Sequence, residues 1–330
     1  MKRTSLVRLA GILSLLALPV LAPAADCWLR DGAAPTANNV IMMCQQGRVY
    51  VSADAGASWT AVETKADAPA RAIAFSDAQH GVVVGDGGLI FSTEDGGKTW
   101  TERLDAKNQH FTTEHLMAVY SLGSRAWTVG FDGIILASAD GGRTWAKQDS
   151  GTTFGLENVY FADQDHGWVV GWSGTILRTE DGGKTWKNVS SKSATWSLSW
   201  VFFKDPKTGW AVGFNGLLLR TKDGGLTWES QKSPIAEWLK SVGVDKGQRL
   251  WIANDDQLLT SADGEKWQAV SVSKPIFMRR MLAVGDKMWA VGQLGIYQQS
   301  DAKPTEWKLI DSLQTPGSSI TTIYTKAGSN

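Results

Sequence analysis

One eight-residue motif recurs along the chain and constrains its fold more than any other feature. The best copy, TEDGGKTW at residues 179–186, follows the pattern Ser/Thr-x-Asp-x-Gly-x-Thr-Trp. The closing tryptophans of successive copies are 39 to 45 residues apart. Seven units with a period near ~40 residues are typical of a β-propeller that has one four-stranded blade per unit. The other copies, the last two of which are degenerate, occupy residues 52–59, 93–100, 138–145, 221–228, 261–267 and 300–307.

The residues of this motif suit a tight turn that leads into a strand. An aspartate can accept hydrogen bonds from nearby backbone N–H groups, and the glycines permit positive φ. The tryptophan has a large surface to bury against a neighbouring blade. The motif resembles the Asp-box, or BNR repeat, which lies on a hairpin away from the ligand face. That resemblance implies a structural role for Asp54, Asp95, Asp140, Asp181, Asp223 and Asp263, and for Trp59, Trp100, Trp145, Trp186, Trp228 and Trp267.

The N-terminus has the pattern of a secretory signal peptide. Lys2, Arg3 and Arg8 form a positive region, an apolar stretch follows at residues 9–20, and small residues precede the expected cleavage near residue 25. No later apolar stretch reaches the roughly 18 residues that a membrane span needs. We therefore expect residues 1–25 to be removed and the rest of the chain to be periplasmic, with no transmembrane segment of its own.

Composition and cysteine usage narrow the classes of function. Lys and Arg together number 33, as do Asp and Glu, so no basic footprint for nucleic acid is expected. The two cysteines, Cys27 and Cys44, predict a disulfide between the N-terminal arm and the first blade of an exported protein. The four histidines show no recognisable ligand spacing, so neither a metal nor a cofactor is expected.

Short apolar runs with Gly-rich turns divide each unit into strands, as at residues 156–161, 167–171, 175–179 and 185–189. When the first unit is divided in the same way, it lacks an inner strand. We expect residues 320–324 to supply it and close the ring, which would make removal of the last dozen residues damaging. The predicted fold is a single all-β, seven-bladed propeller over residues 26–330. Its blades are expected at residues 38–63 with 318–326, 70–104, 115–148, 156–190, 198–231, 238–270 and 279–310.

A second motif accompanies the first in most units. The combined stretch HGWVVGWSGTILRTEDGGKTW at residues 166–186, with its counterparts at 80–100 and 208–228, resembles the photosystem II stability/assembly factor family. The resemblance implies a seven-bladed, non-enzymatic helper that binds a subunit of a membrane-protein complex, here as a relative from a non-photosynthetic bacterium. Its members use an arginine-rich patch near the propeller face. The corresponding basic residues are Arg71, Lys240, Arg279 and Arg280, while Glu157, Leu116 and Ser199 stand at related positions.

Aromatic residues are expected on one face of the propeller. This face carries the B–C loops, which join the second and third strands of a blade, and the D–A loops, which join the last strand of one blade to the first strand of the next. Phe131, Trp172 and Phe214 occupy three consecutive B–C hairpin tips, and Phe154 and Trp196 lie in D–A loops of the same sector. These rings either form a partner-binding patch or fold back onto neighbouring hairpins. The basic residues either line the channel mouth and take an acidic peptide or carboxylate, or are solvated charges paired with Glu157 or Asp245.

Two alternatives have a different chemistry. A sialidase-like or other glycoside hydrolase needs a carboxylate pair, or a Tyr–Glu nucleophile with an arginine triad. Tyr120, Tyr160 and Tyr324 occupy expected core positions, and sialidases have six blades rather than seven. A glycan-binding propeller would use Trp172 and Trp196 as stacking platforms. We expect a monomeric, non-catalytic scaffold or assembly factor that contacts a membrane-protein complex peripherally.

Overall fold

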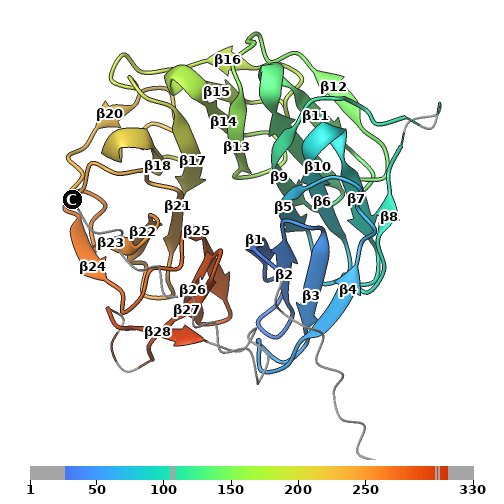
Figure 1. Cartoon of the computed structure of the whole chain (residues 1–330). Coiled ribbons are helices and arrows are strands. Elements are labelled where there is room, and N and C mark those ends of the chain that lie inside the picture. Colours follow the sequence, from blue (N-terminus) through green and yellow to red (C-terminus); the bar gives the residue numbers. More distant parts are fainter. Residues whose placement is uncertain (1–26, 105–106, 108, 302, 304, 311–330) are drawn as a thin grey trace, which may run out of the picture.

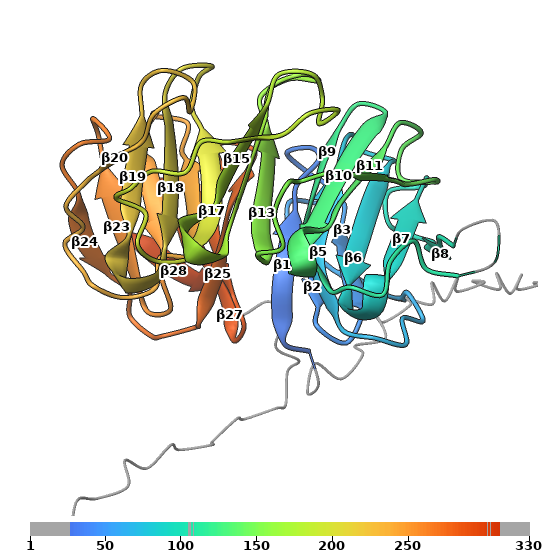
Figure 2. The same cartoon turned by 90° about the horizontal axis from the view of Figure 1, so that it is seen from above.

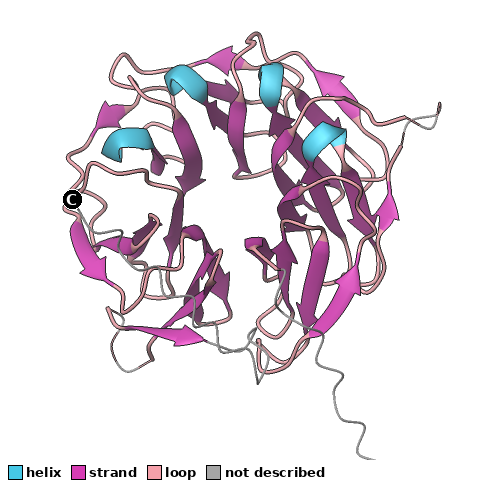
Figure 3. Cartoon of the chain, in the orientation of Figure 1, coloured by secondary structure: helices cyan, strands magenta, loops and turns pink. Residues whose placement is uncertain are grey.

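The computed structural model describes residues 27–104, 107, 109–301, 303 and 305–310. Seven antiparallel sheets of four strands stand in a ring (Figure 1), and in each sheet the strands follow the order of the chain. Strands and loops make up nearly all of the structure, with only short helical turns between them (Figure 3). The prediction of an all-β, seven-bladed propeller is confirmed. The predicted signal peptide lies outside the described residues.

The four strands of each blade lie side by side, with the first at the centre of the ring and the fourth at its rim. The innermost are β1 (Leu29–Ala33), β5 (Ala70–Phe75), β9 (Leu116–Leu122), β13 (Leu156–Phe161), β17 (Leu198–Phe203), β21 (Ser241–Val244) and β25 (Met278–Val284). The second strands are β2 (Val40–Cys44), β6 (Gly81–Gly85), β10 (Arg125–Gly130), β14 (Gly167–Gly171), β18 (Gly209–Gly213), β22 (Leu250–Ala253) and β26 (Lys287–Gly292).

The outer half of each blade is a second hairpin. The third strands are β3 (Arg48–Ser52), β7 (Ile90–Thr93), β11 (Ile135–Ser138), β15 (Ile176–Thr179), β19 (Leu218–Thr221), β23 (Gln257–Ser261) and β27 (Gly295–Gln299). The rim strands are β4 (Thr60–Glu63), β8 (Thr101–Glu102), β12 (Ala146–Gln148), β16 (Lys187–Asn188), β20 (Glu229–Ser230), β24 (Gln268–Ser271) and β28 (Trp307–Ile310).

Four B–C loops, which join second to third strands, form single 3-10 turns. They lie along one face of the ring, the lower face in Figure 2. These turns are η2 (Asp86–Gly88), η3 (Phe131–Gly133), η4 (Trp172–Gly174) and η5 (Phe214–Gly216).

The first blade corrects one expectation. Its inner strand is β1, which pairs with β2 through Leu29 and Cys44, so all four strands come from the N-terminal part of the chain. Strand β1 also contacts β25 and β5, which closes the ring between the last blade and the second. The predicted closure by the C-terminal strand is therefore wrong, and residues 318–326 lie outside the described residues. Sequence patterns missed β1 because its central residue is an aspartate, which is rare in strands.

Asp31 is tolerated there because tertiary contacts satisfy its carboxylate. The side chain is buried, but Oδ1 accepts a hydrogen bond from Gly32 N at 2.8 Å, and Oδ2 accepts one from Ile73 N of the next inner strand at 3.0 Å. The Arg280 guanidinium lies 3.2 Å from Oδ1. A buried charge needs such partners, and here they join blades 7, 1 and 2.

Buried tryptophans join the middle blades to one another. The indole N–H groups of Trp127, Trp168 and Trp210 donate to the carbonyls of the Asp-box glycines of the following blade, Gly182, Gly224 and Gly264. The three rings are each only 1% exposed. The donated bond satisfies the one polar atom of each indole while its apolar area fills the inter-blade core.

The Asp-box aspartates hold their own turns. In the fourth blade, Asp181 Oδ1 accepts hydrogen bonds from Thr179 Oγ1 at 2.8 Å and from Thr185 N at 2.9 Å, and Oδ2 accepts one from Thr185 Oγ1 at 2.6 Å. These hydrogen bonds, those from Thr185 foremost, lower the pKa of Asp181 to about 2. The boxes join third to rim strands, at the opposite end of the blade from the B–C loops, so their carboxylates are remote from the face described next.

Candidate peptide-binding mouth of the propeller

Six of the seven inner strands present one residue at a β-bulge where the strand begins. In blade 2 the register slips between Ala70 and Ala72, which leaves Arg71 without a partner on β6. The same slip recurs in five other blades, and in blade 6 Lys240 directly precedes β21. We call these seven residues the mouth ring. In order from blade 1, they are Arg30, Arg71, Met117, Glu157, Ser199, Lys240 and Arg279.

All seven mouth-ring residues line one cavity of about 510 Å³. Because the inner strands start and the B–C loops turn on the same face, the loop side chains Trp172 and Phe214 line it as well, together with Trp200 and Trp238. This face is also the apolar one. Of the eight large hydrophobic side chains exposed in the described part of the chain, all but Leu226 lie on it.

Basic residues occupy one contiguous half of the mouth ring, which we call the basic arc. It runs through Lys240, Arg279, Arg30 and Arg71 on blades 6, 7, 1 and 2. Two of the four cations are neutralised, because Arg71 pairs with Asp86 and Lys240 pairs with Asp255, each 15 residues further on in a B–C loop.

Arg30 and Arg279 form no ion pair with any described residue. The positions 15 residues after them, where Asp86 and Asp255 stand in their blades, hold Gln45 and Leu294. Burial, and then the positive charges of Arg279 and Arg71, lower the pKa of Arg30. Two adjacent guanidinium groups with no carboxylate of their own make this the part of the cavity best suited to an anion.

Aromatic side chains occupy the other half, over blades 3 to 5 and the entry to blade 6. Phe214 stacks on Trp238 with ring centres 4.3 Å apart, and Phe131 lies 5.1 Å from Trp172. We call these four rings the aromatic arc. Trp172 and Phe214 nevertheless remain 42% and 36% exposed. These rings thus pack on one another and still leave apolar surface open, and their role in partner binding stays a prediction.

Glu157 is the acidic member of the mouth ring. Its carboxylate accepts a hydrogen bond from Trp172 Nε1 at 2.6 Å. Burial raises its pKa, against the opposing effects of that hydrogen bond and of Arg30 and Arg71. The bond to Trp172 orients the indole over the cavity edge.

The structure brings most of the predicted site residues together. Arg71, Lys240, Arg279, Arg280, Trp172 and Phe214 line the cavity. Phe131 contacts Trp172 beside the cavity, and Phe154 and Trp196 are exposed on the same face outside its lining. Of the two alternatives for the basic residues, pairing with Glu157 or Asp245 is wrong, because the ion-pair partners of Arg71, Lys240 and Arg280 are other aspartates. Asp245 instead accepts hydrogen bonds from Trp251 and Gln299.

Several lining residues were missed by the sequence analysis, among them Trp200 and Trp238 of the aromatic half. Arg30 and Asp31 were missed with the strand that carries them, although Leu29-Arg30-Asp31 has the same form as Leu239-Lys240-Ser241. Met117, not Leu116, is the mouth-ring residue of blade 3, because Leu116 is buried opposite Gly130.

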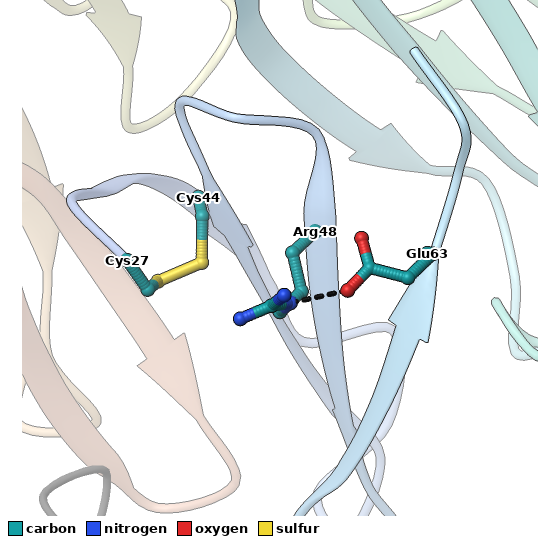
Figure 4. The surroundings of a disulfide bond; sticks show 4 residues. All are labelled: Cys27, Cys44, Arg48 and Glu63. Atoms are coloured by element: carbon teal, nitrogen blue, oxygen red, sulfur yellow. Dashed lines mark hydrogen bonds and ion pairs between the residues drawn. A yellow bond between two sulfur atoms is a disulfide. The ribbon is translucent and has the colours of Figure 1, made fainter. Parts of the chain in front are cut away.

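A disulfide fixes the start of β1 on the same face. Cys27 and Cys44, the pair expected from the sequence, are bonded with their Cα atoms 5.2 Å apart (Figure 4). In the same blade, Arg48 and Glu63 form an ion pair between β3 and β4 at 2.5 Å. Because Arg30 lies three residues after Cys27, the disulfide anchors the backbone that presents this arginine.

Comparison with known proteins shows which family this chain belongs to. A family model described as photosynthesis system II assembly factor YCF48 matches residues 51–154, 145–198 and 191–319. The chain belongs to this family. A search of curated protein sequences finds no match. Within the described residues, no helix is long and apolar enough to cross a membrane, and no cluster of three or more metal-ligating side chains occurs.

Solved structures show the same propeller fold. The structure titled YCF48 bound to D1 peptide has a TM-score of 0.68 at 19% identity, covering 82% of this chain and 92% of that one. YCF48 from Cyanidioschyzon merolae has a TM-score of 0.67 at 17% identity, covering 84% and 96%. A GH74 enzyme of Niastella koreensis has a TM-score of 0.68 at 17% identity, with 87% of this chain and 54% of the enzyme covered. At these identities the likeness concerns the fold alone.

Proposed function

We propose that this YCF48-family protein is a non-catalytic assembly or stability factor, which holds an acidic peptide segment of a membrane-protein client in the mouth of its propeller. The observation that carries the proposal is the pair of unpaired guanidinium groups of Arg30 and Arg279, set opposite the aromatic arc. Family membership supports it, as does the solved YCF48 structure with a D1 peptide bound.

The two halves of the cavity would bind different parts of the peptide. A guanidinium offers paired N–H donors that match the two oxygens of a carboxylate, and partial burial strengthens that contact. The aromatic arc supplies large, rigid contact area, of the kind that dominates binding energy at protein interfaces. An acidic group would be held on blades 7 and 1, with the flanking peptide lying across blades 4 and 5.

The carboxylates of the cavity favour binding over hydrolysis. A glycoside hydrolase needs two carboxyl groups free for separate acid and nucleophile or base roles. Asp31 is engaged by two backbone N–H groups and by Arg280, and Glu157 accepts the Trp172 indole N–H. The cavity lining contains no tyrosine among the described residues.

We also propose that the chain acts outside the cytoplasm, most simply in a bacterial periplasm. The charged and apolar pattern of residues 1–25 supports export. A disulfide between Cys27 and Cys44 fits an oxidising compartment. A client embedded in the inner membrane would be reached there from its periplasmic side.

The test is in-cell cross-linking of the tagged chain, purification from membranes and mass spectrometry. We expect one inner-membrane complex to be recovered, with cross-links on the face of Trp172 and Phe214. Trp172→Ala combined with Phe131→Ala should leave the melting temperature within a few degrees and reduce recovery about tenfold, as for interface hot spots. Leu226→Ala, an exposed apolar residue of the opposite face, is the matched control. Unchanged recovery with the double variant would remove the aromatic arc from the site.

A glycan-binding propeller is the second candidate. The exposed indoles of Trp172 and Trp196, 42% and 52% accessible, could stack on sugar rings, and the unpaired arginines could hold an acidic sugar. If cross-linking recovers no protein, binding of the purified chain to a glycan array decides this alternative. Recovery of a client complex together with an empty array would dismiss it.

A further inference from the structure

Phe277 combines two features that are costly for a folded protein. It is a bulky aromatic residue in the left-handed region, with φ of 52°, and its side chain is 45% exposed. It is the only aromatic residue with positive φ in the described part of the chain. Bulky residues rarely adopt this conformation, and such strain concentrates at sites where the surroundings hold a side chain for use.

The strain follows from how the chain enters blade 7. Ile276 and Met278, on either side of Phe277, are both fully buried. The carbonyls of Ile276 and Phe277 accept hydrogen bonds from Leu294 N at 3.1 Å and Gln293 N at 3.2 Å. The backbone is thus held against the B–C loop while the side chain of Phe277 remains nearly half exposed.

Phe277 lies beside a second exposed apolar residue and an unpaired cation. Leu294 is 47% exposed and occupies the B–C loop position that holds Asp86 and Asp255 in their blades. Arg279, two residues after Phe277, lines the cavity without a carboxylate partner among the described residues. We call Phe277 and Leu294 the apolar ledge. At the B–C loop position where blades 2 and 6 have an aspartate that neutralises their mouth-ring cation, blade 7 therefore has an exposed apolar side chain.

We propose that the apolar ledge is a specificity element that receives a large hydrophobic side chain of the bound peptide, next to the carboxylate held by Arg279 and Arg30. This inference rests on the proposed function and specifies its ligand as an acidic segment flanked by an apolar residue. Charge complementarity identifies the occupant as an acidic peptide segment, because Arg30 and Arg279 line the concave cavity beside the apolar ledge and have no carboxylate partner among the described residues.

The test uses the purified full chain and two fluorescent peptides. In one, a pair of aspartates is flanked by leucine and phenylalanine, and in the other both flanking residues are serine. Phe277→Asn removes the ring and relieves the strain, because asparagine tolerates positive φ. Leu294→Ser removes the other half of the apolar ledge without touching Phe277. Leu226→Asn, at an exposed apolar residue of the opposite face, is the matched control.

We expect the wild-type chain to prefer the apolar peptide about fivefold or more, and each ledge variant to lose that preference. The melting temperature of Phe277→Asn should be unchanged or higher, which a purely structural role of the ring would not give. Equal affinity of the wild type for both peptides, or a preference that survives in both ledge variants, overturns the inference.

The proposed function fails by a different result. If neither peptide binds the wild-type chain, or if Arg279→Gln leaves binding unchanged, the basic arc is not a carboxylate site and the ledge loses its ligand as well. Binding that depends on Arg279 but not on Phe277 or Leu294 overturns the ledge alone. Co-sedimentation with phosphatidylglycerol vesicles, lost in Phe277→Asn, would assign the ledge to a membrane and also overturn the inference.

Discussion

At the level of single residues, the mouth-ring residue at the start of each inner strand sets the charge of the cavity. Arg71, Lys240 and Arg279 could be found from the repeat because their neighbours follow the common strand pattern. Arg30 could not be found in this way, because the aspartate and glycine that follow it are typical of a loop rather than a strand. Nor could the sequence reveal which cations are neutralised, since that depends on B–C loop side chains 15 residues away.

The Asp-box carboxylates make the folding stability depend on pH in the acidic range. Burial raises the pKa of Asp140, but hydrogen bonds from Thr144, Ser138 and Arg143 N outweigh it and bring the value to about 2. This folded-state pKa lies below the unfolded value of about 3.9, so the stabilisation is complete above pH ~4 and is lost as pH falls through ~2.

Asp140→Asn should therefore lower the free energy of unfolding by about 1 kcal/mol at pH 7, after allowance for solvent screening. Near pH 2 the variant and the wild type should be equally stable. Urea unfolding at several pH values measures this difference. A difference that does not shrink toward pH 2 would mean that Asp140 stabilises the turn by something other than its charge.

At the level of elements, the repeat predicted strand positions well where a blade keeps its Gly-rich hairpins. Predicted strands 156–161 and 167–171 agree with β13 and β14. The predicted rim strand 185–189 is shorter, Lys187–Asn188, because Thr185 is engaged by the box aspartate. Side-chain hydrogen bonds compete with the strand ladder at such positions.

The contact between blades 4 and 5 gives a sharp test of inter-blade packing. A Cβ added to Gly225, which has φ of 78°, would lie 2.3 Å from the indole nitrogen of Trp168. Gly141, with φ of 74°, has no atom within 4 Å of such a Cβ. We expect Gly141→Ala to cost about 1–2 kcal/mol for the left-handed conformation alone, and Gly225→Ala about 1–3 kcal/mol more.

Chemical unfolding of the two glycine variants measures both costs. Equal destabilisation would show that Trp168 can move aside, and that the tryptophan contact does not hold the blades in register. A loss in Gly225→Ala accompanied by a changed near-ultraviolet spectrum would locate the damage at the buried indole.

At the level of the whole molecule, the ring is closed by β1 against β25, and the disulfide fixes that strand. The bond closes a loop with a sequence separation of 17 residues. We expect Cys27→Ser combined with Cys44→Ser to lower the free energy of unfolding by about 3 kcal/mol. Wild-type chain unfolded in the presence of a thiol reductant should show the same loss. A cost below about 1 kcal/mol would mean that β1 is held by its strand contacts alone.

In the proposed function, the mouth of the propeller captures a client through Arg30 and Arg279. The most direct test is photo-cross-linking in cells, with a photoreactive amino acid at Met117 in the mouth ring or at Leu226 on the opposite face. We expect a client adduct from position 117 only, and its loss when Arg30→Gln and Arg279→Gln are added. An adduct of equal strength from both positions, or one that survives the loss of both arginines, would contradict capture of the client by the basic arc.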